Sequence, residues 1–108
     1  VLGGLSLLYT WPAEGATEPP VVLMGHMDVV PVPEENRADW MHDPFSGDTA
    51  DGVVWGRGTL DDKTTVLSIL EAAELLLSQG KRPTRTVYLA FGHDEEVGGR
   101  FGARVIVD

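Results

Sequence analysis

Four runs of apolar and strand-forming residues alternate with polar segments along the chain: Leu5 to Trp11, Val21 to Met24, Val53 to Trp55 and Thr86 to Phe91. Each run predicts a β-strand. The run from Val21 to Met24 has no polar position, which is typical of a strand buried on both faces. Pro12 to Pro20 and Glu34 to Ala50 show no clear period, and we expect both segments to be loops.

Helical spacing is clearest between Asp62 and Gln79. The apolar residues of this segment recur three and four positions apart, at Val66, Ile69, Leu70, Ala73, Leu76 and Leu77. Asp61 or Asp62 can cap the start of this helix, and Gly80 suits the position after its end. The segment Arg100 to Val107 is compatible with either a helix or a strand. Strands that alternate with helices predict an α/β fold, with a mixed central sheet and flanking helices.

The composition is that of an ordinary globular chain and limits the chemistry. Its 108 residues suffice for one small domain, and 43% of them are apolar, which is enough for a core. No cysteine is present, so a metal site has to use His, Asp and Glu. The net charge of −9 argues against nucleic acid as a partner. A solvated surface explains most of the acidic excess, but some carboxylates could instead gather around cations.

The ends of the chain and its apolar stretches bear on localisation. No apolar stretch reaches the ~20 residues that span a bilayer, so we expect no membrane segment. The apolar start, Val1 to Tyr9, has neither a charged n-region nor a cleavage site and is unlike a signal peptide. The compartment therefore stays unknown. Because the first residue is not Met and Asp108 directly follows the apolar run Val105 to Val107, we expect a fragment of a longer protein.

Three polar clusters lie at the ends of predicted elements: His26 with Asp28, Asp61 with Asp62, and His93 to Glu96. In open α/β sheets, sites form at the carboxyl ends of the strands. We therefore expect the three clusters to converge. Each of them, taken alone, also has an ordinary structural explanation.

The first two clusters combine possible metal ligands with possible structural roles. A His at a strand end offers an imidazole nitrogen to a metal, and Asp28 can hold its other ring N–H. An ordinary polar turn explains the same pair. Asp61 and Asp62 can act as helix caps. The glycines just before them, Gly56 and Gly58, allow a tight loop that aims a carboxylate, and such a carboxylate can bridge two metals.

The third cluster contains three consecutive acids, Asp94, Glu95 and Glu96. Such acids repel one another unless they are solvated or neutralised by a cation. A solvated turn accounts for them in isolation. Beside a metal, adjacent glutamates can divide the work, since one binds the ion and the other carries a proton from water to a leaving amine. A His, an Asp and a Glu suit zinc, and also manganese or cobalt.

The motifs Gly25 to Pro31, Gly56 to Lys63 and Gly92 to Glu96 together resemble those of the di-zinc carboxypeptidase and aminoacylase family of metallopeptidases. The likeness is closest to the branch of carboxypeptidase S and the N-fatty-acyl amino acid synthase/hydrolase, and it extends over most of the chain. It implies that residues 1–108 are the N-terminal part of the metal-binding catalytic domain, with a zinc-peptidase (phosphorylase/hydrolase-like) fold. The family's lid and dimerisation domain is absent from this chain.

The resemblance also implies a role for each matched residue. His26 would bind one zinc, and Asp28 behind it would be the catalytic residue that orients its ring. Asp61 would bridge both zinc ions, and the peptide that joins it to Asp62 would be cis. Glu96 would bind the second zinc.

Glu95 would be the general base and acid of the same site. Two further ligands that the family uses, an acid and a His, have no counterpart here, since neither His42 nor Asp108 fits their motifs. The implied function is metal-dependent hydrolysis, by a zinc-activated water, of the amide bond of a peptide or an N-acyl amino acid. The full-length form would be a candidate homodimer.

Two other interpretations stay open at this point. One is a truncated, non-catalytic binding module or an inactive remnant of such an enzyme. The other is an acidic α/β domain without a metal. Peptidases and N-acyl amino acid hydrolases share these zinc motifs, so the sequence does not choose the substrate.

Overall fold

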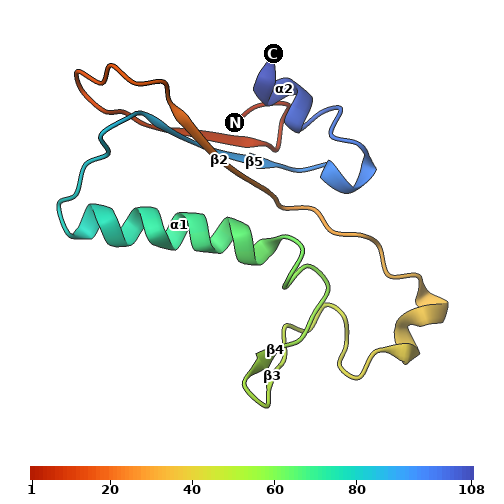
Figure 1. Ribbon diagram of the computed structural model, residues 1–108. Coiled ribbons are helices and arrows are strands. Elements are labelled where there is room, and N and C mark those ends of the chain that lie inside the picture. Colours follow the sequence, from red (N-terminus) through yellow and green to blue (C-terminus); the bar gives the residue numbers. More distant parts are fainter.

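A computed structural model describes residues 1–108 and contains a mixed three-stranded sheet (Figure 1). The strands are β1 (Leu7–Trp11), β2 (Val21–His26) and β5 (Val87–Gly92), in the spatial order β1-β5-β2. The central strand β5 runs antiparallel to β1 and parallel to β2. The predicted α/β fold with a mixed central sheet is confirmed.

Two helices lie on opposite sides of this sheet (Figure 1). Helix α1 (Lys63–Ser78) packs against β2, and the short helix α2 (Ala103–Val107) lies over the other face, near β5. A small hairpin of β3 (Thr49–Ala50) and β4 (Val53–Val54) stands apart from the sheet and precedes α1. None of the helices combines the length and the apolar character that crossing a bilayer requires.

The four predicted strands and the long helix are all present, with ends shifted by a few residues at most. The ambiguous segment Arg100 to Val107 contains helix α2. The expectation that Glu34 to Ala50 is a loop throughout was wrong. A 3₁₀ helix, η1 (Glu34–Asp39), occupies its first part and β3 its last two residues, because a six-residue 3₁₀ helix and a two-residue strand are too short to leave a sequence period.

Burial on both faces, which we expected for the Val21 to Met24 strand, was also wrong. Val22 is 53% exposed and Met24 60% exposed. β2 pairs only with β5 and is an edge strand, and the five residues of α2 cover little of the face opposite α1. The apolar core of the chain is confined to Leu89, Ala90 and Phe91 on the central strand.

The molecule is correspondingly extended. Its Cα radius of gyration is 16.8 Å, whereas a compact domain of this length has a radius near ~13 Å. Helix α1 contributes no fully buried residue. Within its predicted apolar stripe, Val66, Ile69 and Ala73 are half-buried, whereas Leu70, Leu76 and Leu77 are exposed. The sheet and α1 therefore hold the polar strand ends in place, while much of the apolar surface is exposed to solvent.

Candidate metal centre

β2 ends at His26 and brings its imidazole to the carboxyl edge of the sheet. The residue is only 8% exposed. Its Nδ1 lies 3.1 Å from the carbonyl oxygen of Asp28, and its Nε2 lies 3.0 Å from Oδ1 of Asp61. Since a carbonyl can only accept, a neutral ring carries its proton on Nδ1 and directs the Nε2 lone pair at a carboxylate. Two acceptors at this distance repel each other unless a proton or a cation lies between them.

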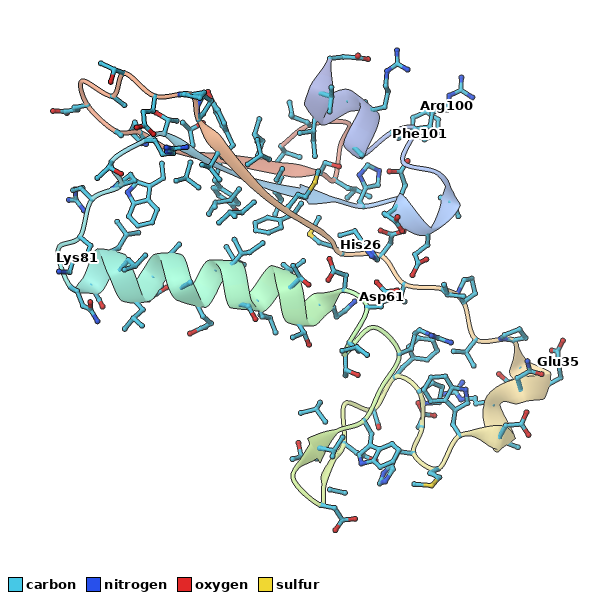
Figure 2. The ribbon with its side chains drawn as sticks, in the orientation of Figure 1. His26, Glu35, Asp61, Lys81, Arg100 and Phe101 are labelled. Atoms are coloured by element: carbon cyan, nitrogen blue, oxygen red, sulfur yellow. The ribbon has the colours of Figure 1, made fainter.

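Asp61 reaches this position from the loop just before α1. Gly58 in that loop has φ +85°, and a Cβ there would collide with Val29, so glycine is required on both counts. The Oγ1 of Thr59 donates a hydrogen bond to the carbonyl of Gly56 at 2.8 Å and tightens the turn. The peptide between Asp61 and Asp62 is cis, as expected. Figure 2 shows His26 and Asp61 facing each other between the end of β2 and the start of α1.

Asp28 connects the first and third clusters through its carboxylate. Its Oδ1 accepts the backbone N–H of Glu95 at 3.1 Å, and its Oδ2 accepts that of Glu96 at 3.0 Å. Oδ1 also lies 3.4 Å from Nδ1 of His26. The predicted contact with the imidazole is therefore present, but the nearest acceptor of Nδ1 is the main-chain carbonyl of Asp28. The carboxylate mainly fixes the segment that carries the two glutamates.

That segment begins the 3₁₀ helix η2 (Glu95–Val97), which follows β5. Oε2 of Glu95 lies 3.8 Å from Nε2 of His26, and the Glu95 side chain is 59% exposed. His26, Asp61 and Glu96 each offer one ligand atom, and these atoms all lie within 4.8 Å of one another. The structure thus brings together all five residues singled out in the sequence: His26, Asp28, Asp61, Glu95 and Glu96.

Burial and charge act in opposite directions on the two titratable groups at the centre of the cluster. Burial tends to lower the pKa of His26, but the hydrogen bond with Asp61 and the nearby Asp28 and Glu95 outweigh it, so the pKa is raised. Burial tends to raise the pKa of Asp28, but the N–H groups of Glu96 and Glu95 outweigh it and lower the pKa. Asp28 is therefore held as a carboxylate, and the site as a whole attracts positive charge.

Two acidic residues of the predicted clusters shape this site in ways that the sequence did not indicate, and neither belongs to the ligand set. Asp62 occupies the cap position of α1, but its side chain makes no capping hydrogen bond. Its Oδ2 accepts the backbone N–H of His26 at 3.1 Å instead. Asp94 is 7% exposed, and its Oδ2 accepts the N–H of Phe101 at 2.6 Å, so it anchors the chain after η2 and is no part of a solvated turn.

His42 and Asp108, which fit no family motif, also lie outside the cluster. His42 stacks on Trp55 at 4.8 Å between ring centroids, and its Nδ1 lies 3.1 Å from Oδ2 of Asp48. Asp108 accepts a hydrogen bond from Nε of Arg104 at 2.9 Å.

An imidazole surrounded by carboxylates at the edge of an α/β sheet defines a candidate metal centre. Residues 22–108 match the model of Peptidase family M20/M25/M40, and the chain belongs to this family. Members of the family are metal-dependent hydrolases, typically with zinc.

Individual relatives agree with this assignment. The chain is 50% identical over 103 residues, 95% of its length, to a probable carboxypeptidase S-like 2 of Dictyostelium discoideum. It is 46% identical over its whole length to the N-fatty-acyl-amino acid synthase/hydrolase PM20D1 of Xenopus tropicalis. It spans 20% of the length of each of these proteins. The crystal structure of human carnosine dipeptidase 1 superposes with a TM-score of 0.73 at 26% identity, over 86% of this chain and 19% of that one.

Proposed function

We propose that residues 1–108 are the N-terminal part of the catalytic domain of a metal-dependent hydrolase that cleaves an amide bond in a peptide or an N-acyl amino acid. The family assignment supports hydrolysis, and the two kinds of relative support the two substrate classes. The remaining ligands and the substrate pocket would come from other parts of the full-length protein.

The donor set fits a divalent cation. The observation that carries the proposal is the 3.0 Å approach of Nε2 of His26 to the Asp61 carboxylate, two ligand atoms between which a bound cation can take the place of a proton. Glu96 adds a further carboxylate oxygen to the same cluster. One imidazole and two carboxylates are suitable ligands for zinc, with cobalt or manganese as alternatives.

The proposed centre would hold two zinc ions. His26 would bind one ion, Asp61 would bridge the pair through its two oxygens, and Glu96 would bind the other. When bound, such a pair supplies the positive charge that activates water and stabilises the developing oxyanion of the amide. Other residues of the chain would then have to orient the three ligands and to carry the proton of the attacking water.

Glu95 is placed to move that proton. Its carboxylate lies beside the cluster, 3.8 Å from His26, and is more than half exposed, so water and substrate can reach it. It would take a proton from the attacking water and deliver it to the leaving amine. Asp28 would act as the orienting residue, because it contacts His26 and holds the N–H groups of both Glu95 and Glu96.

The test uses the protein at its full native length. We expect the purified protein to hold zinc and to hydrolyse N-acyl amino acids or peptides with a free carboxylate. Chelation should abolish hydrolysis, and added zinc should restore it. Glu95→Gln should lower the rate ~10²–10⁴-fold while zinc content is retained.

The matched control is Glu74→Gln, at an exposed residue of α1 outside the cluster, which should change neither zinc content nor rate. A protein that binds no zinc, and whose hydrolysis is indifferent to chelator and to Glu95→Gln, would overturn the proposal. Such a result would favour a non-catalytic binding module.

A further inference from the structure

The two residues that follow Asp61 both hold the main chain at the end of β2. Oδ2 of Asp62 accepts the backbone N–H of His26 at 3.1 Å. Nζ of Lys63 donates to the carbonyl oxygen of Met27 at 3.1 Å. Two successive residues after the proposed ligand Asp61 therefore hydrogen-bond to the end of β2, which carries the proposed ligand His26.

The edge of β2 explains why such a grip is available. The N–H of Met27 donates to Gly92 on β5 at 2.9 Å. Neighbouring residues of a strand direct their backbone groups to opposite edges, so the N–H of His26 points away from β5. β2 has no other neighbouring strand. The Asp62 carboxylate supplies the acceptor that a strand would otherwise supply.

The residue before His26 makes this approach possible. A Cβ at Gly25 would lie 2.9 Å from Oδ2 of Asp62 and 3.1 Å from Cγ2 of Val66. Both distances are shorter than normal contacts, so a side chain at position 25 would push the start of α1 away from β2. The absence of a side chain at Gly25 therefore lets the carboxylate reach the His26 amide.

Neither ordinary explanation of Asp62 accounts for this contact. The side chain of a helix cap accepts an N–H group of the first turn of its own helix, and the side chain of Asp62 accepts none of these. A metal ligand would join the cluster of His26, Asp61 and Glu96, but Asp62 is not among the residues whose ligand atoms converge there. Its oxygen is bonded to the main chain behind the imidazole.

We propose that Asp62 and Lys63 are positioning residues that clamp the His26–Met27 backbone and so fix the imidazole against Asp61. The inference rests on the proposed metal centre and deepens it. Without the clamp, the strand end and the α1 loop would move relative to each other, and the 3.0 Å spacing between His26 and Asp61 would be lost. Mutation of residues that orient metal ligands typically weakens metal affinity ~10–100-fold.

The test compares four variants of the full-length protein by zinc dissociation constant, measured by competition with a chromophoric chelator. Asp62→Ala removes the acceptor, and we expect zinc to bind ~10–100-fold more weakly. Asp62→Asn keeps an amide oxygen at the same place and should restore most of the affinity. Lys63→Met keeps the stem but removes the donor, and it should also weaken zinc binding. Lys81→Met, an exposed lysine after α1, is the control and should leave zinc affinity unchanged.

A second measurement follows the clamp itself in the zinc-free protein. Hydrogen exchange at the His26 amide should be faster in Asp62→Ala than in the parent and in Lys81→Met. This readout separates the two proposals, because it depends on the backbone contact and not on zinc. If the parent binds no zinc, the proposed function fails whatever the exchange shows.

Other results would overturn the clamp alone. If the parent binds zinc and Asp62→Ala binds it within twofold, with unchanged exchange at His26, the carboxylate positions nothing. If Asp62→Asn is as weak as Asp62→Ala, the hydrogen-bond acceptor is not what matters. If Asp62→Ala fails to fold, Lys63→Met decides, and unchanged zinc affinity in that variant overturns the inference.

Discussion

Replacing Asp28 by Asn gives a demanding test of the site, because the two side chains have the same shape. The carboxylate accepts two main-chain N–H groups, those of Glu95 and Glu96, at 3.1 and 3.0 Å. An amide has only one oxygen, so its NH₂ group would face one of these N–H groups, donor against donor. Asp28→Asn therefore breaks one hydrogen bond outright and removes the charge from the other.

The magnitude follows from the strength of such bonds. A hydrogen bond to a charged acceptor contributes ~1.5–3 kcal/mol, and one between neutral groups ~0.5–1.5 kcal/mol. Losing one charged bond and weakening the other should cost about 2–4 kcal/mol, because the Asp28 side chain is only 20% exposed and water replaces little of the loss. Part of this cost falls on the position of Glu96, so zinc affinity should drop ~10–100-fold.

The assay is zinc competition on the full-length protein, together with thermal unfolding of the zinc-free form. Asp39→Asn, at the exposed end of η1, serves as the isosteric control and should leave both quantities unchanged. If Asp28→Asn binds zinc within twofold of the parent and unfolds at the same temperature, then the bonds to the η2 segment do not hold the site together, and the reasoning is wrong.

Three further predictions concern the frame around the site. Gly58→Ala should destabilise the protein by about 1–3 kcal/mol in denaturant unfolding, because position 58 has φ +85° and the added Cβ collides with Val29. Gly15→Ala, at φ +70° in open space, should destabilise the protein less. Equal effects of the two substitutions would contradict the steric part of the argument. The pKa of Asp43 is lowered first by the backbone N–H of Phe45 and then by Arg37. In an NMR titration of Arg37→Gln, the pKa of Asp43 should therefore return only part of the way to its ordinary value. A full return would show that the hydrogen bond from Phe45 has no effect. Since the folded-state pKa is the lower one, the stabilisation by Asp43 is present above the unfolded-state value of about 4 and is lost as pH falls through the folded value. Residues 1–108 expressed alone should bind a hydrophobic dye and unfold without a sharp transition, because so few apolar residues are buried; a cooperative transition without dye binding would refute this.

The strands and the long helix could be predicted because their signals are local. The spacing of Val66, Ile69 and Ala73 marks the face of α1 that packs on the sheet, and these residues are the half-buried ones in the structure. The exposure of β2 could not be predicted, because an apolar run such as Val22 to Met24 is the same whether or not another element covers it. Burial depends on neighbours that the run does not encode.

The site illustrates the same limit. The residue types and their places at the ends of predicted elements were enough to predict that the three clusters converge, and the family resemblance then selected His26, Asp61 and Glu96 as the ligands. The structure brings one ligand atom of each within 4.8 Å of the others. The role of Asp62 was hidden, since an acid at a helix start has the same local pattern whether it caps the helix or reaches across to β2. Asp94 was grouped with the two glutamates after it, although the structure buries Asp94 and leaves Glu95 exposed.

The central claim is that side chains from three separated segments surround a shared pair of metal ions. Its most direct test is a crystal structure of the full-length protein grown with zinc, with anomalous diffraction recorded above and below the zinc absorption edge. We predict two anomalous peaks, one beside His26, the other beside Glu96, and Asp61 in contact with both. Peaks elsewhere in the molecule, or none beside these three residues, would contradict the account.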